Sequence, residues 1–299
     1  MRLGAVVLNY GTPATTISAV RSIQAYASPG QVIVVDNASR DDSVERLRAE
    51  LQNVTVVVSP NNLGFSAGYN LGIREAVGRG AERVLMLNSD AVLTGDTIDL
   101  LDAALTGDVA IAGPLIVGMG TSGRIESAGV NYAVSTGRMY HRLHGISSSN
   151  VVVPDLAEVD AVSGCAVLVR REVFETVGLL AEEFFYGFED IEFCLRARGA
   201  GFRTVCIGRA VVEHQGAASI GPSSPRRLYF AARNHLLLAS RFGPQAWPIR
   251  VARAVNIVGL NVAHALVRSG TPIAPGLTAI GRGVRDHLKG RYGSDVSES

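Results

Sequence analysis

The chain is poor in the features that mark several large protein classes. Cysteine occurs only three times in 299 residues, at Cys165, Cys194 and Cys206, and no two of them have a CxxC spacing. Because each lies in an apolar segment, we expect buried free thiols and a reducing compartment, which excludes a disulfide-stabilised secreted domain. Charged residues make up 18% and the net charge is +1, so a nucleic-acid binder driven by general attraction to phosphates is excluded as well.

Long hydrophobic runs are also missing. Residues 3–8 are apolar, but this run is too short for the core of a signal peptide. The segment 251–267 comes closest to the roughly 20 apolar residues of a membrane span, yet four polar side chains interrupt it: Arg253, Asn256, Asn261 and His264. We therefore expect a soluble or peripheral protein of the cytoplasm. The 47% of hydrophobic residues suffices for one large domain, or for one domain with an appendage.

The first 115 residues alternate short apolar runs with stretches of helical periodicity. The runs have the continuous apolarity of strands buried in a parallel sheet, and they lie at 3–8, 32–35, 54–58, 84–87 and 109–112. Helices are predicted between them at 14–27, 41–51, 66–78 and 96–105. This alternation predicts an α/β fold with a doubly wound, mostly parallel central sheet.

The rest of the chain has a looser pattern. Strands are predicted at 151–153, 158–162, 166–170, 203–207 and 210–213, and helices at 170–177 and 189–199. A loop rich in Gly, Ser and Pro follows at 216–225, and its composition is typical of a mobile lid. Three further helices are predicted at 226–242, 246–268 and 276–289.

Polar clusters directly follow four of the predicted strands, at 9–10, 36–39, 61–64 and 88–90. In open parallel sheets, ligands bind beyond the carboxyl ends of the strands, so these clusters predict one polar, acidic site. The turn at 9–13 has no GxGxxG, which excludes a dinucleotide-binding Rossmann site. A metal held by the carboxylate of Asp90 is the alternative means of holding phosphates, although Asp90 could instead cap the helix that begins near residue 95.

Seven short motifs occur in an order that resembles one enzyme family. They are VLNY at 7–10, VVDNASRD at 34–41, NNLGFSAGYN at 61–70, LNSD at 87–90, VSGC at 162–165, FEDIEFCLR at 188–196 and EH at 213–214. Over about residues 1–240 the chain resembles family 2 glycosyltransferases of the GT-A fold, in particular their bacterial rhamnosyltransferase-like branch. The resemblance implies inverting transfer of a sugar from a nucleotide-diphosphate donor, dTDP-L-rhamnose or a UDP-hexose, to a hydroxyl of a glycan or polyprenyl-linked acceptor.

The resemblance also implies a division of the chain. We expect a catalytic domain at 1–242, with a donor-binding half at about 1–115 and an acceptor-binding half at about 116–242. A helical C-terminal extension follows at 243–299. It contains seven basic residues between 250 and 291 against Asp286 alone. Such helices either lie at the anionic inner face of the cell membrane or pack on the catalytic domain or in a dimer interface.

Matching the family's donor motifs assigns the nucleotide-binding residues. Leu8, Asn9 and Tyr10 are expected to line the pocket for the base, and Asp36 to accept a hydrogen bond from a pyrimidine imide, since a carboxylate only accepts. The remaining positions are Asn37, Asn62, Gly64, Gly68, Asn88 and Ser89. Residues 36–37 could also cap a helix, and the glycines could serve only turns and packing.

The metal and catalytic residues are assigned by the same resemblance. The family's metal motif is Asp-any-Asp, and this chain departs from it with Asn88 in the first place, so Asp90 and His214 remain as ligands for Mn²⁺ or Mg²⁺. The nitrogen ligand favours Mn²⁺. Asp190 matches the catalytic base and Glu189 its neighbour, and nearby acids are expected to raise the pKa of the base. Carboxylates at a helix start are also favoured by the helix dipole alone.

Three residues are expected to face the acceptor or the sugar: Ser163, Gly164 and Arg233. A solvated helix face is the alternative for Arg233. His141 and His144 have no assigned role. Two rival functions are a sugar-nucleotide pyrophosphorylase, which normally begins with a Gly-rich basic loop that 9–13 lacks, and an inactive glycan-binding or scaffolding relative, in which Asp90, Asp190 or His214 would be lost.

Overall fold

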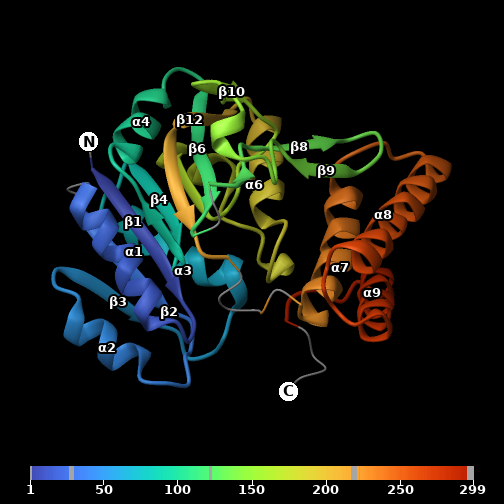
Figure 1. Cartoon of the computed structure of the whole chain (residues 1–299), viewed down its shortest axis with the longest axis horizontal. Helices are drawn as coiled ribbons and strands as arrows, with labels where there is room; N and C mark the ends of the chain where they lie inside the picture. Colours follow the sequence, from blue (N-terminus) through green and yellow to red (C-terminus); the bar gives the residue numbers. More distant parts are fainter. Residues whose placement is uncertain (1, 27–29, 121–122, 217–220, 222, 295–299) are drawn as a thin grey trace.

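The structure is a computed structural model that describes residues 2–26, 30–120, 123–216, 221 and 223–294. In the described residues, a ten-stranded sheet forms the centre, helices lie on both of its faces, and three C-terminal helices stand beside it (Figure 1). The main path of the sheet runs β10-β12-β6-β11-β4-β1-β2-β3. The expected α/β fold with a mostly parallel central sheet and C-terminal helices is therefore confirmed.

The first half of the sheet is a parallel block in which every strand ends at the same edge. The register places Asn9 beside Asp36 and Leu8 beside Asn88, so the polar clusters that follow the strands meet there. The strands are β1 (Leu3–Asn9), β2 (Gln31–Asp36), β3 (Val54–Val58) and β4 (Arg83–Asn88). The connecting helices are α1 (Pro13–Tyr26), α2 (Ser43–Glu50) and α3 (Gly64–Gly78).

Alternate side chains of the buried strands pack against different helices. Val6 of β1 packs in one core cluster with Ile73 of α3, whereas its neighbour Val7 packs in another with Ile17 of α1 and Leu47 of α2. This two-sided burial follows from the period of two residues in a strand. It explains why these strands are apolar throughout rather than alternating.

The second half of the sheet joins the first through an antiparallel strand. β11 (Ala166–Arg170) lies between β4 and β6 (Val109–Gly118), and the long β12 (Arg203–His214) runs parallel to β6. The short β5 (Ala91–Leu93) pairs with the end of β12 and sets His214 opposite Ala91. This pairing brings the residue before β5, Asp90, next to His214. The remaining helices of this half are α4 (Thr97–Ala104), α5 (Arg171–Val177) and α6 (Glu189–Gly199).

The region of weak sequence pattern holds most of the differences from expectation. The strand predicted at 151–153 is wrong, because these residues lie outside any strand, and the one predicted at 158–162 is reduced to the edge strand β10 (Leu156–Glu158). The two strands predicted at 203–207 and 210–213 are one strand with a register shift between Ile207 and Val211. Short elements that the pattern did not indicate are β7 (Ile125–Ser127), the hairpin β8 (Val130–Ala133) and β9 (Arg138–His141), and the turns η1 (Ser148–Asn150) and η2 (Glu182–Phe184).

The three C-terminal helices pack on one another at one side of the molecule (Figure 1). They are α7 (Pro225–Arg241), α8 (Trp247–Val267) and α9 (Ile273–Leu288). Phe230 of α7, Ala265 of α8 and Ile280 of α9 share a core with Phe185, which precedes α6. Within the described ranges, none of the helices combines the length and the hydrophobicity that crossing a bilayer requires. Half of the predicted lid at 216–225, residues 217–220 and 222, lies outside the described residues.

Candidate active site

The end of β1 is tied to the end of β2 by a buried polar network. Asp36 is fully buried, and its Oδ2 accepts hydrogen bonds from Asn9 Nδ2 at 2.8 Å and from Ser39 Oγ at 2.6 Å, while its Oδ1 accepts one from the Ser39 backbone N–H at 3.0 Å. Thr16 of α1 donates to Asn9 Oδ1 at 2.7 Å. The carboxylate of Asp36 therefore fixes the loops after both strands.

The segment after β3 is held against the same loops by amide side chains. Asn37 is buried and donates from Nδ2 to Asn62 Oδ1 at 3.1 Å and to the Gly64 carbonyl at 3.0 Å, and it accepts from Leu63 N–H at 2.9 Å. Gly64 has a φ of +81°, and a Cβ there would lie 2.4 Å from the ring of Phe185. Only glycine fits this close approach, which allows the N–H of Phe65 to bond the Phe185 carbonyl at 2.6 Å.

These loops surround a cleft with a volume of about 100 Å³. Five of the residues that line it were assigned to the nucleotide from the sequence, namely Leu8, Tyr10, Asn37, Asn62 and Gly64. Phe65, Phe185, Tyr186 and Arg226 complete the lining. Phe65 lies in the motif at 61–70 but had no assigned role, and the other three were not foreseen because no strand end or motif marks them. Asp36 and Asn9 are fully buried and are not among the lining residues. In this structure they fix the loops around the cleft, and the expectation that Asn9 lines it is wrong.

Two further donor residues lie where β4 ends. Asn88 Oδ1 accepts a hydrogen bond from the buried Tyr69 hydroxyl at 3.3 Å, and Ser89 Oγ accepts one from Thr12 Oγ1 at 3.3 Å. A Cβ on Gly68 would lie 2.6 Å from Leu8 Cδ1, so this glycine lets α3 pack directly on the end of β1. The structure thus places all ten residues of the nucleotide assignment at one edge of the sheet.

Asp90, His214 and Glu126 form an acidic cluster beside that edge. His214 Nε2 lies 3.2 Å from Asp90 Oδ1, and its Nδ1 lies 2.7 Å from Glu126 Oε2. Burial alone would lower the pKa of His214, but hydrogen bonds with Asp90, Cys165 and Glu126 outweigh it and raise the pKa to about 12. Glu126 comes from β7, in the stretch without sequence pattern, so no signal in the sequence singled it out.

The cluster fits a divalent cation as an open site. Within the described parts of the chain, no three His, Cys, Asp or Glu side chains are arranged so that they alone could hold a metal ion. Mg²⁺ is usually held by one or two carboxylates together with substrate phosphates and water. A ligating histidine usually has a carboxylate on its other nitrogen, which is the arrangement of His214 and Glu126. Asp90 and His214 would hold the ion, and the imidazole would release its proton when the ion binds.

Glu189 and Asp190 begin α6 on the other side of β11. Asp190 Oδ2 accepts a hydrogen bond from the Gly164 N–H at 2.8 Å, and burial raises the pKa of Asp190 although this bond and that from Ile191 act in the opposite direction. Burial, and then the charge of Asp190, raise the pKa of Glu189 to about 8. In the described chain Glu189 Oε2 has no hydrogen-bond partner. The pair therefore has carboxylates that hold protons more strongly than usual.

The turn before this pair is held in an unfavourable backbone conformation. Phe185 and Phe188 have φ values of +59° and +75°, which are rare for bulky residues and cluster at functional sites. Asn234 of α7 stabilises the turn by donating to the carbonyls of Phe184 at 2.7 Å, Tyr186 at 2.9 Å and Gly187 at 3.0 Å. The turn thus forms a wall of the cleft and positions the carboxylate pair.

The three residues assigned to the acceptor or the sugar lie in different surroundings. Ser163 and Gly164 precede β11, and Ser163 Oγ accepts from Cys165 N–H at 3.3 Å. Arg233 is fully buried in α7 and donates to the carbonyls of Phe184 at 3.1 Å and Gly293 at 2.8 Å. Because no part of Arg233 is exposed, it neither lies on a solvated helix face nor faces an acceptor or sugar in this structure.

The structure also excludes two capping alternatives. The residue before α4 is Asp96 rather than Asp90, and the residue before α2 is Asp42 rather than Asp36. Glu189 and Asp190 do stand in the first turn of α6, so the helix dipole stabilises their charges in any case. All three cysteines are buried and free, as expected.

Known proteins resemble this chain in sequence. It is 28% identical over 217 residues to the dTDP-rhamnosyl transferase RfbF of Shigella flexneri, covering 69% of this chain and 70% of that protein. It is also 28% identical over 267 residues to an N-acetylglucosaminyl-diphospho-decaprenol L-rhamnosyltransferase of Mycobacterium tuberculosis, covering 81% of this chain and 84% of that protein.

Solved structures show the same fold. The mannosyltransferase PcManGT from Pyrobaculum calidifontis, in complex with GDP-Man and Mn²⁺, aligns with a TM-score of 0.60 at 17% identity, covering 96% of this chain and 87% of that one. S. aureus TarS aligns with a TM-score of 0.55 at 16% identity, covering 97% and 83%. A family model described as "Glycosyltransferase like family 2" matches residues 2–236. Since that match spans most of the chain, the protein belongs to glycosyltransferase family 2 and is a glycosyltransferase.

Proposed function

We propose that the protein is an inverting, metal-dependent glycosyltransferase that moves a sugar from a nucleotide diphosphate to a hydroxyl of a glycan or lipid-linked acceptor. One observation carries this proposal: the donor cleft, the acidic cluster and the carboxylate pair meet around residues 163–165. Asn88 N–H bonds the Cys165 carbonyl at 2.8 Å, and Gly164 N–H bonds Asp190 at 2.8 Å. A leaving group held by Asp90 and an acceptor facing Asp190 would therefore lie on either side of this short segment.

The donor is proposed to be dTDP-L-rhamnose, with a UDP-hexose as the alternative. Two relatives are named for rhamnosyl transfer, which supports the first donor. The aromatic rings of Tyr10 and Tyr186 and the amides of Asn37 and Asn62 line the cleft. Rings of this kind stack on a base, and amides hydrogen-bond its polar edge.

A divalent cation, Mn²⁺ or Mg²⁺, is proposed at Asp90 and His214. Two solved neighbours, PcManGT and GalNAc-T7, are complexes that contain Mn²⁺, which supports this cofactor. When bound, the ion would offset the negative charge that develops on the departing diphosphate. Glu126 orients the imidazole through Nδ1, and the Tyr69 hydroxyl orients the Asn88 amide.

Asp190 is proposed as the general base. Its raised pKa makes it a stronger base than an ordinary aspartate, and its bond to Gly164 fixes the carboxylate where β11 begins. Glu189 is proposed to hold a proton at neutral pH, since the pKa of about 8 favours its neutral form. A neutral neighbour leaves the negative charge on Asp190, which removes the acceptor proton in a single displacement that inverts the anomeric carbon.

The lipid-linked acceptor is supported by the decaprenol in the name of the mycobacterial relative. Such an acceptor lies in a membrane, so we further propose that the protein works in the cytoplasm at the inner face of the cell membrane. Residues 1–242 would form the catalytic domain and 243–299 an extension. The rival function of a pyrophosphorylase disagrees with the family membership.

The test is a donor screen with purified protein, in which dTDP-L-rhamnose, UDP-hexoses and GDP-mannose are offered with Mn²⁺, Mg²⁺ or chelator. Calorimetry should detect binding of dTDP or UDP, and binding should weaken when the cation is chelated. Electron paramagnetic resonance of free Mn²⁺ measures the cation itself, and Asp90→Ala should abolish its uptake with the nucleotide. Failure of every nucleotide to bind would instead favour an inactive glycan-binding or scaffolding relative.

A further inference from the structure

α8 is an unusual helix for the surface of a protein. Among its 21 residues, a single narrow stripe is buried, made of Arg253, Ile257, Asn261 and Ala265. Apolar side chains stand out on the rest of the helix, with exposed fractions of 74% for Trp247, 68% for Val255 and 79% for Val267. Large exposed apolar surfaces mark sites of interaction, so the fold leaves much of the surface of α8 without a partner within the described chain.

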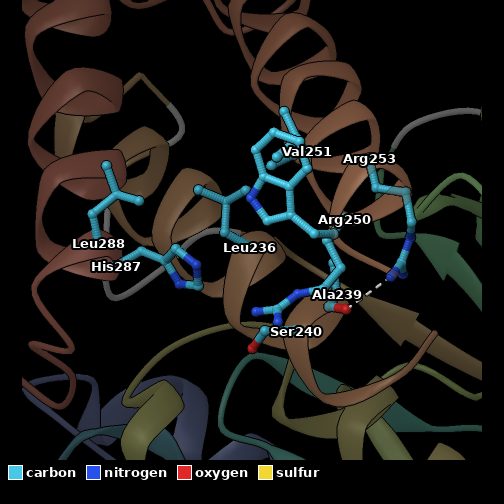
Figure 2. A pocket seen from close by; sticks show the side chains of 10 residues that line it. Leu236, Ala239, Ser240, Arg250, Val251, Arg253, His287 and Leu288 are labelled. Atoms are coloured by element: carbon cyan, nitrogen blue, oxygen red, sulfur yellow. Dashed lines mark hydrogen bonds between the residues drawn. The ribbon is translucent and has the colours of Figure 1, made fainter. Parts of the chain in front are cut away.

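A cleft of about 280 Å³ opens beside the beginning of this helix. Figure 2 shows that Leu236, Ala239 and Ser240 of α7, Arg250 and Val251 of α8, and His287 and Leu288 of α9 surround it. We define the cleft rim as the exposed lining residues of α8 and α9, Trp247, Arg250, Val251 and Leu288. The lining is therefore apolar on most sides, with a cation at its rim.

Positive charge at the cleft is not balanced by carboxylates. Arg250 is exposed, and no ion pair of the described chain involves it. Arg253 is 4% exposed and donates only to neutral oxygens, those of Ala239 and Phe242 and the Tyr132 hydroxyl, while its Nε has no hydrogen-bond partner in the described chain. A buried cation without a carboxylate favours an anion nearby. The cleft therefore suits a ligand with both a negative charge and an apolar part.

Gly243 shows that the chain is shaped around this cation. It has a φ of +137°, and a Cβ there would lie 2.2 Å from Arg253 Nη1. Any other residue would displace the guanidinium, so the sequence between α7 and α8 accommodates Arg253 directly beneath the cleft.

The charges also decide between two kinds of partner. A two-fold dimer would set the cleft rim against its own copy, and Arg250 and the exposed Lys289 would then face like charges. The one carboxylate between 246 and 291 is Asp286, which is mostly enclosed, accepts a hydrogen bond from Tyr229 at 3.0 Å and lies 3.7 Å from Arg285. At such a two-fold interface the second copy therefore offers no complementary charge, whereas a bilayer with anionic lipids offers both a hydrocarbon phase and negative phosphates.

We propose that the cleft rim docks on an anionic lipid bilayer, with the phosphate of one lipid at Arg250 in the cleft and with Trp247, Val251 and Leu288 among the lipid chains. Arg253 adds positive potential from below. The inference deepens the proposed function, because it names the contact by which the enzyme would reach a lipid-linked acceptor.

The experiment measures co-sedimentation of the full chain with vesicles of phosphatidylglycerol and phosphatidylcholine, and with phosphatidylcholine alone. The chain should pellet with the anionic vesicles at low salt and much less with neutral ones or at high salt. Each unit of charge near such a surface is worth about fivefold in binding, so Arg250→Glu should lower the partition coefficient by about 25-fold. Trp247→Ser should lower it by roughly tenfold, since it removes a buried ring from the interface.

Matched variants elsewhere on the molecule serve as controls. Arg48→Glu makes the same charge reversal on α2, and Tyr26→Ser removes an exposed aromatic ring at the end of α1. Apart from the effect of the changed net charge, neither variant should change the partition coefficient by more than about twofold. If Arg48→Glu reduces binding as strongly as Arg250→Glu, only general charge attracts the protein and the cleft proposal is overturned. Gel filtration coupled to light scattering should show a monomer, and a dimer broken by Trp247→Ser would overturn the proposal in favour of a second copy.

Donor turnover separates this inference from the proposed function. Arg250→Glu should keep the donor hydrolysis of the unmodified chain in vesicle-free buffer, because the cleft lies outside the donor site. If donors are turned over and no form pellets with anionic vesicles, the docking proposal fails alone. If the chain binds vesicles through the cleft rim and no nucleotide sugar is a donor, the proposed function fails alone. Inorganic phosphate that competes with vesicles at millimolar concentration would show a phosphate site without docking, and that result too would overturn the proposal.

Discussion

The two acidic groups beside β4 and β11 differ in what compensates their charge. Asp90 and Glu126 share the imidazole of His214, at 3.2 Å and 2.7 Å. Glu189 and Asp190 have backbone amides or no partner at all, and their pKa values are raised by burial. The same residue type therefore has two environments. The first group shares one imidazole, which suits the cation site proposed there. The second is buried without a cation, which raises the pKa and suits the proposed proton transfer.

A third buried carboxylate shows that this difference is built by the neighbours. Glu192 lies three residues after Glu189 on α6 and is 2% exposed, but Arg196 at 2.9 Å and Arg241 at 3.0 Å pair with it. Carboxylates of one helix thus range from fully paired to unpaired over a single turn. Burial without a neighbouring cation raises the pKa of Glu189 and Asp190, and such shifts are frequent in catalytic acids and bases.

The largest effect is expected from removing the proposed general base, which belongs to the buried carboxylate pair. Asp190→Asn should lower the rate of transfer by roughly 10²–10⁴-fold, the usual contribution of a general base, because an amide cannot accept the acceptor's proton. Donor binding measured by calorimetry should stay within about threefold, since Asp190 is not among the residues that line the donor cleft. A variant with nearly normal turnover, together with an inactive Glu189→Gln, would reverse the roles of the two residues.

The next prediction concerns stability and separates Glu189 from Glu192. The pKa of Glu189 is raised to about 8 in the folded protein, whereas in the unfolded chain it has an ordinary value near 4.3. Between these values the folded state binds more protons, so the free energy of unfolding should fall as the pH rises through this window, by a few kcal/mol at most. Urea unfolding of Glu189→Gln should show a weaker pH dependence and greater stability above pH 8.

The matched control is Glu192→Gln, which leaves Arg196 without its carboxylate and leaves Arg241 with Glu183 alone. It should destabilise the protein throughout the neutral range by roughly 3–5 kcal/mol, the usual effect of breaking a buried ion pair. Equal effects of the two substitutions at pH 8.5 would mean that α6 does not distinguish paired from unpaired carboxylates.

A smaller effect is expected on the affinity for the metal ion at Asp90 and His214. Glu126→Gln keeps the shape of the side chain but removes the charge behind His214, and substitutions of this kind lower metal affinity by roughly 10–100-fold. Titration of Mn²⁺ in the presence of the nucleotide, followed by electron paramagnetic resonance, measures the change. Glu213→Gln, on the same strand end as His214 and exposed, is the control and should bind Mn²⁺ normally; unaltered affinity in Glu126→Gln would remove Glu126 from the site.

The smallest effect is expected at Asn88, which stands where the family's metal motif has its first Asp. Tyr69→Phe removes the hydroxyl that bonds Asn88 Oδ1 at 3.3 Å, and the loss of one neutral hydrogen bond is worth about 0.5–1.5 kcal/mol. Affinity for the donor should therefore fall by between about two- and tenfold. Tyr132→Phe removes a hydroxyl that lies 3.3 Å from Arg253, outside the donor cleft. This variant should leave donor affinity unaltered. An equal loss in both variants would assign the effect to stability.

Much of the fold could be predicted from the sequence because its signals are local. A strand buried on both faces needs an unbroken apolar run, and all five runs of the first 115 residues lie in strands, β1 to β4 and β6. Chain order then places the polar clusters at one edge, since parallel strands end together. The prediction failed in the stretch 116–165 because the local signal is too weak there. The strands β7, β8 and β9 are three or four residues long, too short for periodicity to show.

The sequence by itself determined which side chains stand at the edge of the sheet, because order and periodicity are properties of neighbours in the chain. Only the tertiary structure decided what each of them faces. Glu126 reaches His214 across 88 positions, Phe185 closes the donor cleft because Gly64 leaves room for it, and Arg233 turns inward to hold the carbonyl of Phe184. Such pairings depend on strand register and on the packing of distant segments, where a carboxylate gains or loses a partner through a contact that no local pattern records.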